Sequence, residues 1–160
     1  MTVKIYTDGG SLGNPGPGGY GVVILDENRR ELSQGYSLTT NNRMEILAAI
    51  KGLEKLEKSC DVTVYTDSRY LADAINKGWA LRWKANRWMR NRKEKALNVD
   101  LWKKLLPLCE KHRVTFEWVK GHAGNPENER CDFLARSAAK GRNLLPDTGY
   151  NPVNQQSSLF

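Results

Sequence analysis

Two segments of the sequence share one form, a run with alternating apolar side chains that ends in an aspartate. Residues 5–8 read Ile-Tyr-Thr-Asp and residues 64–67 read Val-Tyr-Thr-Asp, which predicts two β-strands that each carry a carboxylate at the carboxyl end. Ligands of open α/β sheets bind at that edge. Two carboxylates about 4 Å apart repel by roughly 4 kcal/mol at an effective dielectric constant of about 20. We therefore expect Asp8 and Asp67 to share a site that holds cations.

Four acidic residues are candidates for this site, and each has an ordinary structural role as an alternative. Asp8 could belong to a turn, and Asp67 could cap the helix that follows it. Glu45 could be the acid of a capping box that starts three residues earlier, and Asp132 could pair with Arg136 one helical turn later. A shared site explains all four positions at once, because two lie at one sheet edge and two lie in helices that begin beside it.

The ligand atoms of this proposed site indicate its chemistry. Carboxylate oxygens without a supporting set of histidines or cysteines favour Mg²⁺, with Mn²⁺ as a possible substitute. Two such ions about 3.5 to 4 Å apart can activate a water and stabilise the leaving oxygen of a phosphodiester. His122 lies in a glycine-flanked loop between the last predicted strand and the helix with Asp132, so we expect it to move protons. A solvated loop histidine without a role is the alternative.

The positive charge of the chain is concentrated in one segment. Residues 77–95 contain eight basic side chains and one acidic side chain, a net charge of +7 that equals the net charge of the whole chain. Because solubility needs no such clustering, the segment predicts a polyanionic partner. Three tryptophans are interleaved with the charges, and they could grip a nucleic-acid backbone or simply pack the segment onto its neighbours. The residues expected to make the contact are Trp79, Arg82, Trp83, Lys84, Arg87 and Trp88.

The hydrophobic periodicity predicts one α/β domain over residues 1–142 and a mobile tail over residues 143–160. A long glycine-rich turn is predicted for residues 9–21. The predicted strands are residues 3–8, 20–25, 31–38, 64–67 and 113–119. The predicted helices begin after residues 39–42, at 68, near 98 and at 125. Strand, helix and strand in succession form a crossover unit, so the two strands that end in aspartate should be parallel.

Composition excludes several classes of protein. No apolar run approaches the roughly 20 residues of a membrane span, and the first residues lack a signal-peptide pattern. Cys60, Cys109 and Cys131 form no C-x-x-C pair, so neither a disulfide framework nor a zinc site is predicted. We expect a cytoplasmic monomer with no membrane partner and with reduced, largely buried thiols.

Four motifs resemble those of bacterial type 1 ribonuclease H. They are TDGGSLGNPGPGGYG at residues 7–21, TTNNRME at 39–45, TDS at 66–68 and WVKGHAGNPENERCD at 118–132. The resemblance spans roughly residues 3–150. It implies a ribonuclease H-like α/β fold, with a five-stranded mixed sheet flanked by helices. It also implies endonucleolytic cleavage of the RNA strand of RNA/DNA hybrids, with 3′-hydroxyl and 5′-phosphate products.

The resemblance also implies roles for individual residues. Asp8, Glu45, Asp67 and Asp132 correspond to the metal-binding catalytic acids, two ions being bound together with substrate, and His122 corresponds to an assistant in proton movement. By the same resemblance, the surface that senses ribose 2′-hydroxyls includes Asn14 and Asn41, and the pocket for a DNA phosphate includes Thr40 and Asn98. Residues 79–95 correspond to the family's basic protrusion. Leu38 and Arg69 depart from the family pattern, Arg69 at a position that contacts the RNA strand.

The end of the chain carries a further resemblance. Residues 156–160 are similar to the short peptide by which bacterial replication and repair proteins dock on the sliding clamp, with Gln156, Ser158, Leu159 and Phe160 as its anchors. A solvated tail without a partner is the alternative.

For the chain as a whole, the alternatives to a ribonuclease are a nucleic-acid-binding module without catalysis and an integrase-like DNA nuclease.

Overall fold

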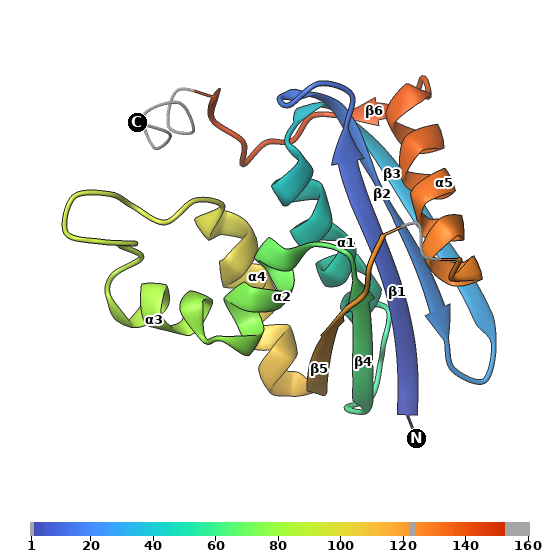
Figure 1. Cartoon of the computed structure of the whole chain (residues 1–160), viewed down its shortest axis with the longest axis horizontal. Helices are drawn as coiled ribbons and strands as arrows, with labels where there is room; N and C mark the ends of the chain where they lie inside the picture. Colours follow the sequence, from blue (N-terminus) through green and yellow to red (C-terminus); the bar gives the residue numbers. More distant parts are fainter. Residues whose placement is uncertain (1, 122–123, 153–160) are drawn as a thin grey trace.

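The computed structural model describes residues 2–121 and 124–152 (Figure 1). These residues form one mixed β-sheet with helices on both of its faces. Val22 lies against Gly52 of one helix, whereas its neighbour Gly21 lies against Cys131 of another. Because successive side chains of a strand point to opposite faces, these two helices cover opposite sides of the sheet. The protein is therefore a layered α/β structure, as the sequence predicts.

The sheet has the strand order β5-β4-β1-β2-β3-β6. β1 pairs antiparallel with β2 and parallel with β4, which confirms the predicted crossover. A five-stranded sheet is expected from the sequence, and β6 is a short sixth strand that extends it. The strands are β1 (Thr2–Ser11), β2 (Gly16–Leu25), β3 (Arg29–Thr39), β4 (Asp61–Thr66), β5 (Arg113–Trp118) and β6 (Leu144–Leu145).

Five helices complete the described fold, and most of the apolar core lies between the sheet and α1. Ten residues of α1 are buried, and Trp102 of α4 is fully buried beside it. α3 is a short helix within the basic segment, to which the sequence assigns no structure. The helices are α1 (Asn41–Glu54), α2 (Arg69–Asn76), α3 (Trp79–Ala85), α4 (Val99–Lys111) and α5 (Pro126–Lys140).

The predicted long turn over residues 9–21 is wrong. β1 and β2 continue through most of this segment as a hairpin, so that only residues 12–15 connect them. Two of its glycines, Gly19 and Gly21, serve helix packing rather than turning. A Cβ atom at Gly19 would lie 2.7 Å from the carbonyl oxygen of Ala135, and one at Gly21 would lie 2.3 Å from that of Cys131. The glycines therefore let the backbone of α5 approach the strand closely.

Part of the segment that the sequence assigns to a tail is bound to the domain. β6 pairs parallel with β3, and the carboxylate of Asp147 accepts hydrogen bonds from Thr39 and from the buried guanidinium of Arg43. Arg43 also forms an ion pair of 2.7 Å with Asp100. Because an unpaired buried guanidinium is costly, Arg43 needs these carboxylates, and they hold residues 144–147 against the fold.

Candidate metal centre and nucleic-acid interface

Neighbouring parallel strands position the first two candidate acids. The register of β1 and β4 pairs Tyr6 with Tyr65, two residues before Asp8 and Asp67 respectively. β1 runs on past this point because it stays paired with β2 as far as Ser11, so Asp8 lies inside a strand rather than at its end. Asp8 and Asp67 therefore lie side by side on neighbouring chain segments, as predicted.

The structural alternatives for three of the acids fail. Ser68 caps α2, since its hydroxyl accepts from the N–H of Leu71, so Asp67 is not the cap. Thr40 caps α1, which removes Glu45 from the acid position of a capping box. Asp8 pairs with Gly21 in the sheet and belongs to no turn.

Glu45 reaches the aspartates because α1 begins against β1. A Cβ atom at Gly9 would lie 2.4 Å from the backbone carbon of Met44 and 2.6 Å from the nitrogen of Glu45, so only glycine permits this approach. Carboxylate oxygens of Asp8, Glu45 and Asp67 consequently lie within 4.8 Å of one another. The predicted convergence of these three acids is confirmed.

Burial and mutual repulsion perturb these carboxyls. Burial, with the negative charges of Asp67 and Asp132, raises the pKa of Asp8 to about 8. Burial raises the pKa of Glu45 well above its usual range, and the charges of Asp8 and Asp67 raise it further. Strongly perturbed titratable groups that gather in one place are typical of functional sites.

A bound cation fits this arrangement. Glu45 is 6% exposed, and its Oε1 atom is buried without a hydrogen-bond partner among the described residues. An orphaned buried carboxylate oxygen is costly, and a metal ion would satisfy it. The donors are hard oxygens, which suit Mg²⁺ or Mn²⁺.

Asp132 adjoins the same cluster from α5. It interacts with the carboxyl of Asp8 and lines, with Asp8, Gly9 and Gly10, a hollow of about 260 Å³. Its expected ion pair with Arg136 is also present, at 3.2 Å. The pairing does not remove Asp132 from the site, because one carboxylate can serve both contacts.

Comparisons with known proteins agree with this geometry. The family model for RNase H matches residues 1–140. The chain belongs to the ribonuclease H family. It is 68% identical over 149 residues to a ribonuclease H of Syntrophus aciditrophicus. The aligned residues make up 92% of this chain and 86% of that protein. This family member is accordingly a hydrolase of the nuclease class.

Solved structures of ribonucleases H share the fold. LC9-RNase H1, a type 1 RNase H with the type 2 active-site motif, aligns with a TM-score of 0.76 at 30% sequence identity. The alignment covers 98% of this chain and 84% of the LC9-RNase H1 chain. LC11-RNase H1 in complex with RNA/DNA hybrid aligns with a TM-score of 0.64 at 27% sequence identity. The alignment covers 86% of this chain and 96% of the LC11-RNase H1 chain. The predicted ribonuclease H-like fold is confirmed.

Beside the acids of this ribonuclease H family member, three side chains form a hydrogen-bonded group. The amide oxygen of Asn41 accepts from the backbone N–H of Ser11 at 2.8 Å and from its hydroxyl at 3.1 Å. The amide oxygen of Asn14 accepts from the N–H of Asn41 at 3.0 Å and from the Ser11 hydroxyl at 3.4 Å. Both amide oxygens are thereby used, which leaves the NH₂ groups as donors for a ligand.

The two residues predicted for a phosphate pocket, Thr40 and Asn98, both make contacts within the domain, and their role stays a prediction. Thr40 uses its hydroxyl to cap α1, and Asn98 is buried in a left-handed conformation with φ of 61°. The Asn98 amide donates to the hydroxyl of Tyr70 and its oxygen faces Arg43 at 3.4 Å. Asn98 and Arg43 also line a cavity of about 730 Å³. Leu38, a departure from the family pattern, is 44% exposed on β3.

The basic segment projects from the domain as α3 and the loop that follows it (Figure 1). Arg82, Lys84 and Arg87 are exposed, as a phosphate-binding role requires. Trp79, Trp83 and Trp88 are half-buried against the apolar core, so the packing alternative holds for all three. The 730 Å³ cavity lies between this segment and the domain, and its basic lining residues are Arg43, Arg87, Lys93, Lys95 and Lys103.

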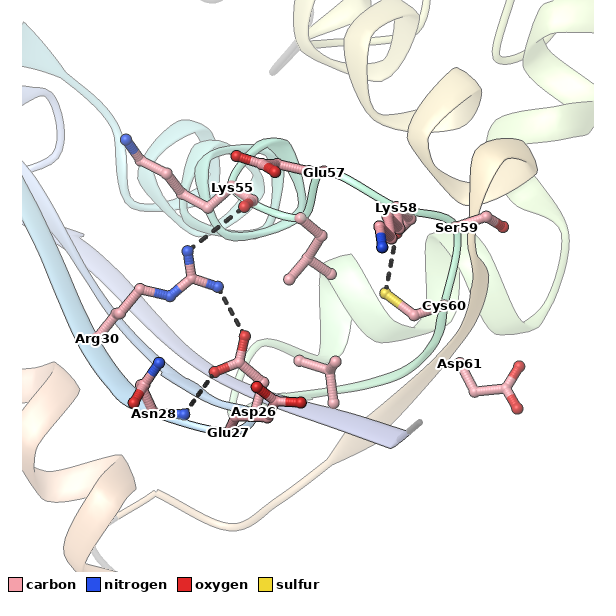
Figure 2. A pocket seen from close by; sticks show the side chains of 12 residues that line it. Asp26, Glu27, Asn28, Arg30, Lys55, Glu57, Lys58, Ser59, Cys60 and Asp61 are labelled. Atoms are coloured by element: carbon pink, nitrogen blue, oxygen red, sulfur yellow. Dashed lines mark hydrogen bonds and ion pairs between the residues drawn. The ribbon is translucent and has the colours of Figure 1, made fainter.

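A pocket of about 680 Å³ at the other end of the strands holds none of the predicted site residues (Figure 2). Asp26 pairs there with Arg30 at 2.9 Å, and Arg30 donates to the carbonyl of Lys55 at 3.5 Å. The Cys60 thiol donates to the carbonyl of Lys58 at 3.2 Å. The side chains of Asp26, Arg30 and Cys60 therefore already have partners within the protein.

Some predicted residues lie outside the described part of the chain. These are His122 and the clamp-binding anchors Gln156, Ser158, Leu159 and Phe160, whose roles stay predictions. No described helix is long and apolar enough to cross a membrane.

Sequence reasoning missed Ser11 and Arg43, because a hydroxyl among glycines and an arginine among polar helix residues carry no distinguishing spacing.

Proposed function

We propose that this chain is a cytoplasmic, monomeric endonuclease that hydrolyses the RNA strand of RNA/DNA hybrids and leaves 3′-hydroxyl and 5′-phosphate ends. The observation that carries the proposal is the convergence of Asp8, Glu45 and Asp67 within 4.8 Å beside the amides of Asn14 and Asn41. The named ribonuclease H relatives, and the hybrid in the LC11-RNase H1 complex, support the choice of substrate.

In this proposal Asp8, Glu45, Asp67 and Asp132 hold the metal ions. Two Mg²⁺ ions, or Mn²⁺ in their place, would supply activation of a water and stabilisation of the leaving oxygen when bound with substrate. The four carboxylates, which come from β1, α1, α5 and the residue that follows β4, would hold these ions beside the cleaved linkage. In the same proposal, His122 takes up or delivers a proton during the reaction.

Strand discrimination comes from donors that face the minor groove. The NH₂ groups of Asn14 and Asn41 would donate to ribose 2′-hydroxyls, which DNA lacks. Thr40 and Asn98 would bind a phosphate of the DNA strand, and the exposed cations of α3 and the loop that follows it would hold its backbone without reading sequence.

The proposal is tested with labelled RNA/DNA, RNA/RNA and DNA/DNA duplexes, each incubated with and without Mg²⁺. We expect Mg²⁺-dependent cuts confined to the RNA of the hybrid, with 5′-phosphate and 3′-hydroxyl ends. Equal cutting of DNA/DNA would favour an integrase-like nuclease, and hybrid binding without any cleavage would favour a module that has lost catalysis.

Ser11 should orient the two asparagines, because its hydroxyl contacts both amide oxygens. Replacing Ser11 with Ala is expected to lower kcat/KM for the hybrid about three- to tenfold, the worth of one net hydrogen bond. Ser33→Ala, on the exposed part of β3, is the matched control. Equal kcat/KM values for the two variants would show that the hydroxyl has no part in recognition.

Neutralising Arg82, Lys84 and Arg87 together to Gln should weaken hybrid binding and flatten its salt dependence. The slope of log K against log salt is expected to fall by up to about 0.9 for each phosphate that the variant no longer neutralises. The measurement is Kd in EDTA over a series of NaCl concentrations. A control with Lys55→Gln and Lys58→Gln removes positive charge at the opposite end of the sheet. An unchanged slope in the first variant would mean that the segment does not touch the backbone.

A further inference from the structure

A buried arginine at the start of α1 joins three separate parts of the chain. Arg43 is 1% exposed. Its Nε donates at 2.7 Å to Asp147, which lies in the segment after β6, and its Nη2 donates to the same carboxylate at 3.0 Å. Nη1 and Nη2 donate to Asp100 of α4 at 2.9 and 2.7 Å. Because two carboxylates each accept two bonds from it, the guanidinium is held in one orientation.

The same guanidinium supports one of the two residues predicted for the phosphate pocket. Nη1 of Arg43 donates to Oδ1 of Asn98 at 3.4 Å, and Nδ2 of Asn98 donates to the hydroxyl of Tyr70 at 3.2 Å. Asn98 is 5% exposed and has a positive φ of 61°, a conformation that asparagine adopts more readily than most residues. Contacts on both sides of its amide therefore fix the orientation of Asn98.

Asp147 reaches the other predicted pocket residue through a neighbour in sequence. The hydroxyl of Thr39 donates to Asp147 at 2.7 Å, and Thr39 directly precedes Thr40, the cap of α1. The side chain of Asp147 is 9% exposed, whereas that of Asp100 is 40% exposed. Asp147 is thus the more buried of the two carboxylates, and it connects Arg43 with the end of β3.

The chain after β6 passes over this group of side chains, and in Figure 1 it runs past the beginning of α1. A Cβ atom at Gly149 would overlap the carboxylate of Asp100 and lie 2.9 Å from Nη2 of Arg43, so a larger residue would disturb this ion pair. Gly149 and Asn151 line the 730 Å³ cavity together with Arg43 and Asn98. Part of the segment that the sequence assigns to a tail therefore forms part of the cavity wall.

We infer that Asp147 positions Asn98 and Thr40 to bind a phosphate of the DNA strand. It acts through its bonds to Arg43 and Thr39, which order the pocket before the phosphate arrives. The inference rests on the proposed function, which assigns that phosphate to Asn98 and Thr40. Asp147 is a positioning residue, and the segment after β6 thereby belongs to the nucleic-acid interface.

Charge and position predict opposite effects of removing this carboxylate. A negative charge close to a bound phosphate repels it, so loss of the charge alone would tighten binding. Loss of the fixed geometry would weaken binding, because the pocket must then become ordered when the phosphate binds. The direction in which the Kd changes therefore distinguishes positioning by Asp147 from an effect of its charge.

The test is the Kd of an RNA/DNA hybrid in EDTA, with circular dichroism to verify the fold of each variant. Asp147→Asn is expected to weaken binding about three- to tenfold, in the range of one net hydrogen bond. Thr39→Val removes the hydroxyl that donates to Asp147 without changing the charge, and a smaller loss in the same direction is expected.

The matched control is Asp26→Asn. It removes a carboxylate that also pairs with an arginine, Arg30, at the opposite end of the sheet. Its Kd should stay within about twofold of the parent value, because screening limits long-range effects. The two Asp→Asn variants change the net charge of the chain equally, so the comparison isolates the place of the carboxylate.

A second measurement assigns the effect to one strand. DNA strands are prepared with one uncharged methylphosphonate linkage at successive positions and are paired with unmodified RNA. For the parent protein, one position should weaken binding more than its neighbours do. For Asp147→Asn that position should have a smaller effect, because the pocket for this phosphate is already disturbed, and the other positions should respond as in the parent.

Three results would overturn the inference. Equal Kd values for Asp147→Asn and Asp26→Asn would show that Asp147 is only structural, even if thermal stability falls. Tighter binding by Asp147→Asn would show that the carboxylate acts through its charge. A variant with the parent's response to every methylphosphonate would place the effect outside the pocket. If Asp147→Asn does not fold, Thr39→Val takes its place in these comparisons. A parent profile without a sensitive DNA position would instead refute the proposed pocket itself.

Discussion

Replacing Asp67 with Asn is expected to lower kcat for hybrid cleavage by at least about a thousandfold, a barrier increase of roughly 4 kcal/mol. The amide has the shape of the carboxylate but lacks its charge, so it weakens cation binding where Asp8, Glu45 and Asp67 converge. The cap of α2 is unaffected, because Ser68 supplies it. The measurement is single-turnover cleavage of a labelled hybrid in Mg²⁺, with circular dichroism to verify the fold.

Asp26→Asn is the matched control for that experiment. Asp26 is also an aspartate that follows a strand, but it lies at the opposite end of the sheet and pairs with Arg30 (Figure 2). Its kcat should stay within about twofold of the parent value, because surface ion pairs contribute little. Retention of more than a tenth of the parent activity by Asp67→Asn would contradict the metal-centre assignment.

The acidic cluster could be predicted from the sequence because its placement depends on strand periodicity and connection rules. The two Tyr-Thr-Asp runs predict strands, and the intervening helix makes them parallel, so Asp8 and Asp67 must emerge together. Glu45 follows because α1 starts at the same edge. These are short-range patterns combined with one topological rule, and both hold here.

Packing between distant segments could not be predicted in the same way. The glycines of residues 9–21 have the composition of a turn, but Gly19 and Gly21 serve the approach of α5, which begins a hundred residues later. The anchoring of residues 144–147 depends on Arg43, whose burial no local pattern indicates. In both cases the deciding contact is with a helix or strand far away in sequence.

The basic segment is an intermediate case. Its charge excess is visible in the sequence, and Arg82, Lys84 and Arg87 are exposed as a polyanion-binding surface requires. Its tryptophans, however, pack against the apolar core. The ring centre of Trp83, for example, lies 6.0 Å from that of Trp102. The same segment can therefore pack through its indoles and bind through its cations, because long basic side chains reach past the apolar surface they cover.

The acidic cluster should also make the stability of the metal-free protein depend strongly on pH. The pKa of Asp8 is about 8 in the folded protein, well above its ordinary value near 4, because burial and Asp67 disfavour the charged form. The folded state therefore binds more protons than the unfolded state between these values, and stability falls as the pH rises through them. We expect the free energy of unfolding in EDTA to fall by about 3 to 5 kcal/mol from pH 5 to pH 9, since one pKa unit corresponds to about 1.4 kcal/mol.

Asp8→Asn should remove much of this slope, because the amide has no proton to lose. At pH 9 in EDTA the variant should be more stable than the parent protein, whereas at pH 4 the two should differ little. Urea unfolding at each pH measures both quantities, and Asp61→Asn, a carboxylate more than half exposed and outside the cluster, should keep the parent slope. Mg²⁺ at pH 8 should stabilise the parent protein more than Asp8→Asn, because a bound cation offsets the same repulsion that the substitution removes. A steeper slope in Asp8→Asn, or equal stabilisation of both proteins by Mg²⁺, would mean that Asp8 neither repels its neighbours nor holds an ion with them.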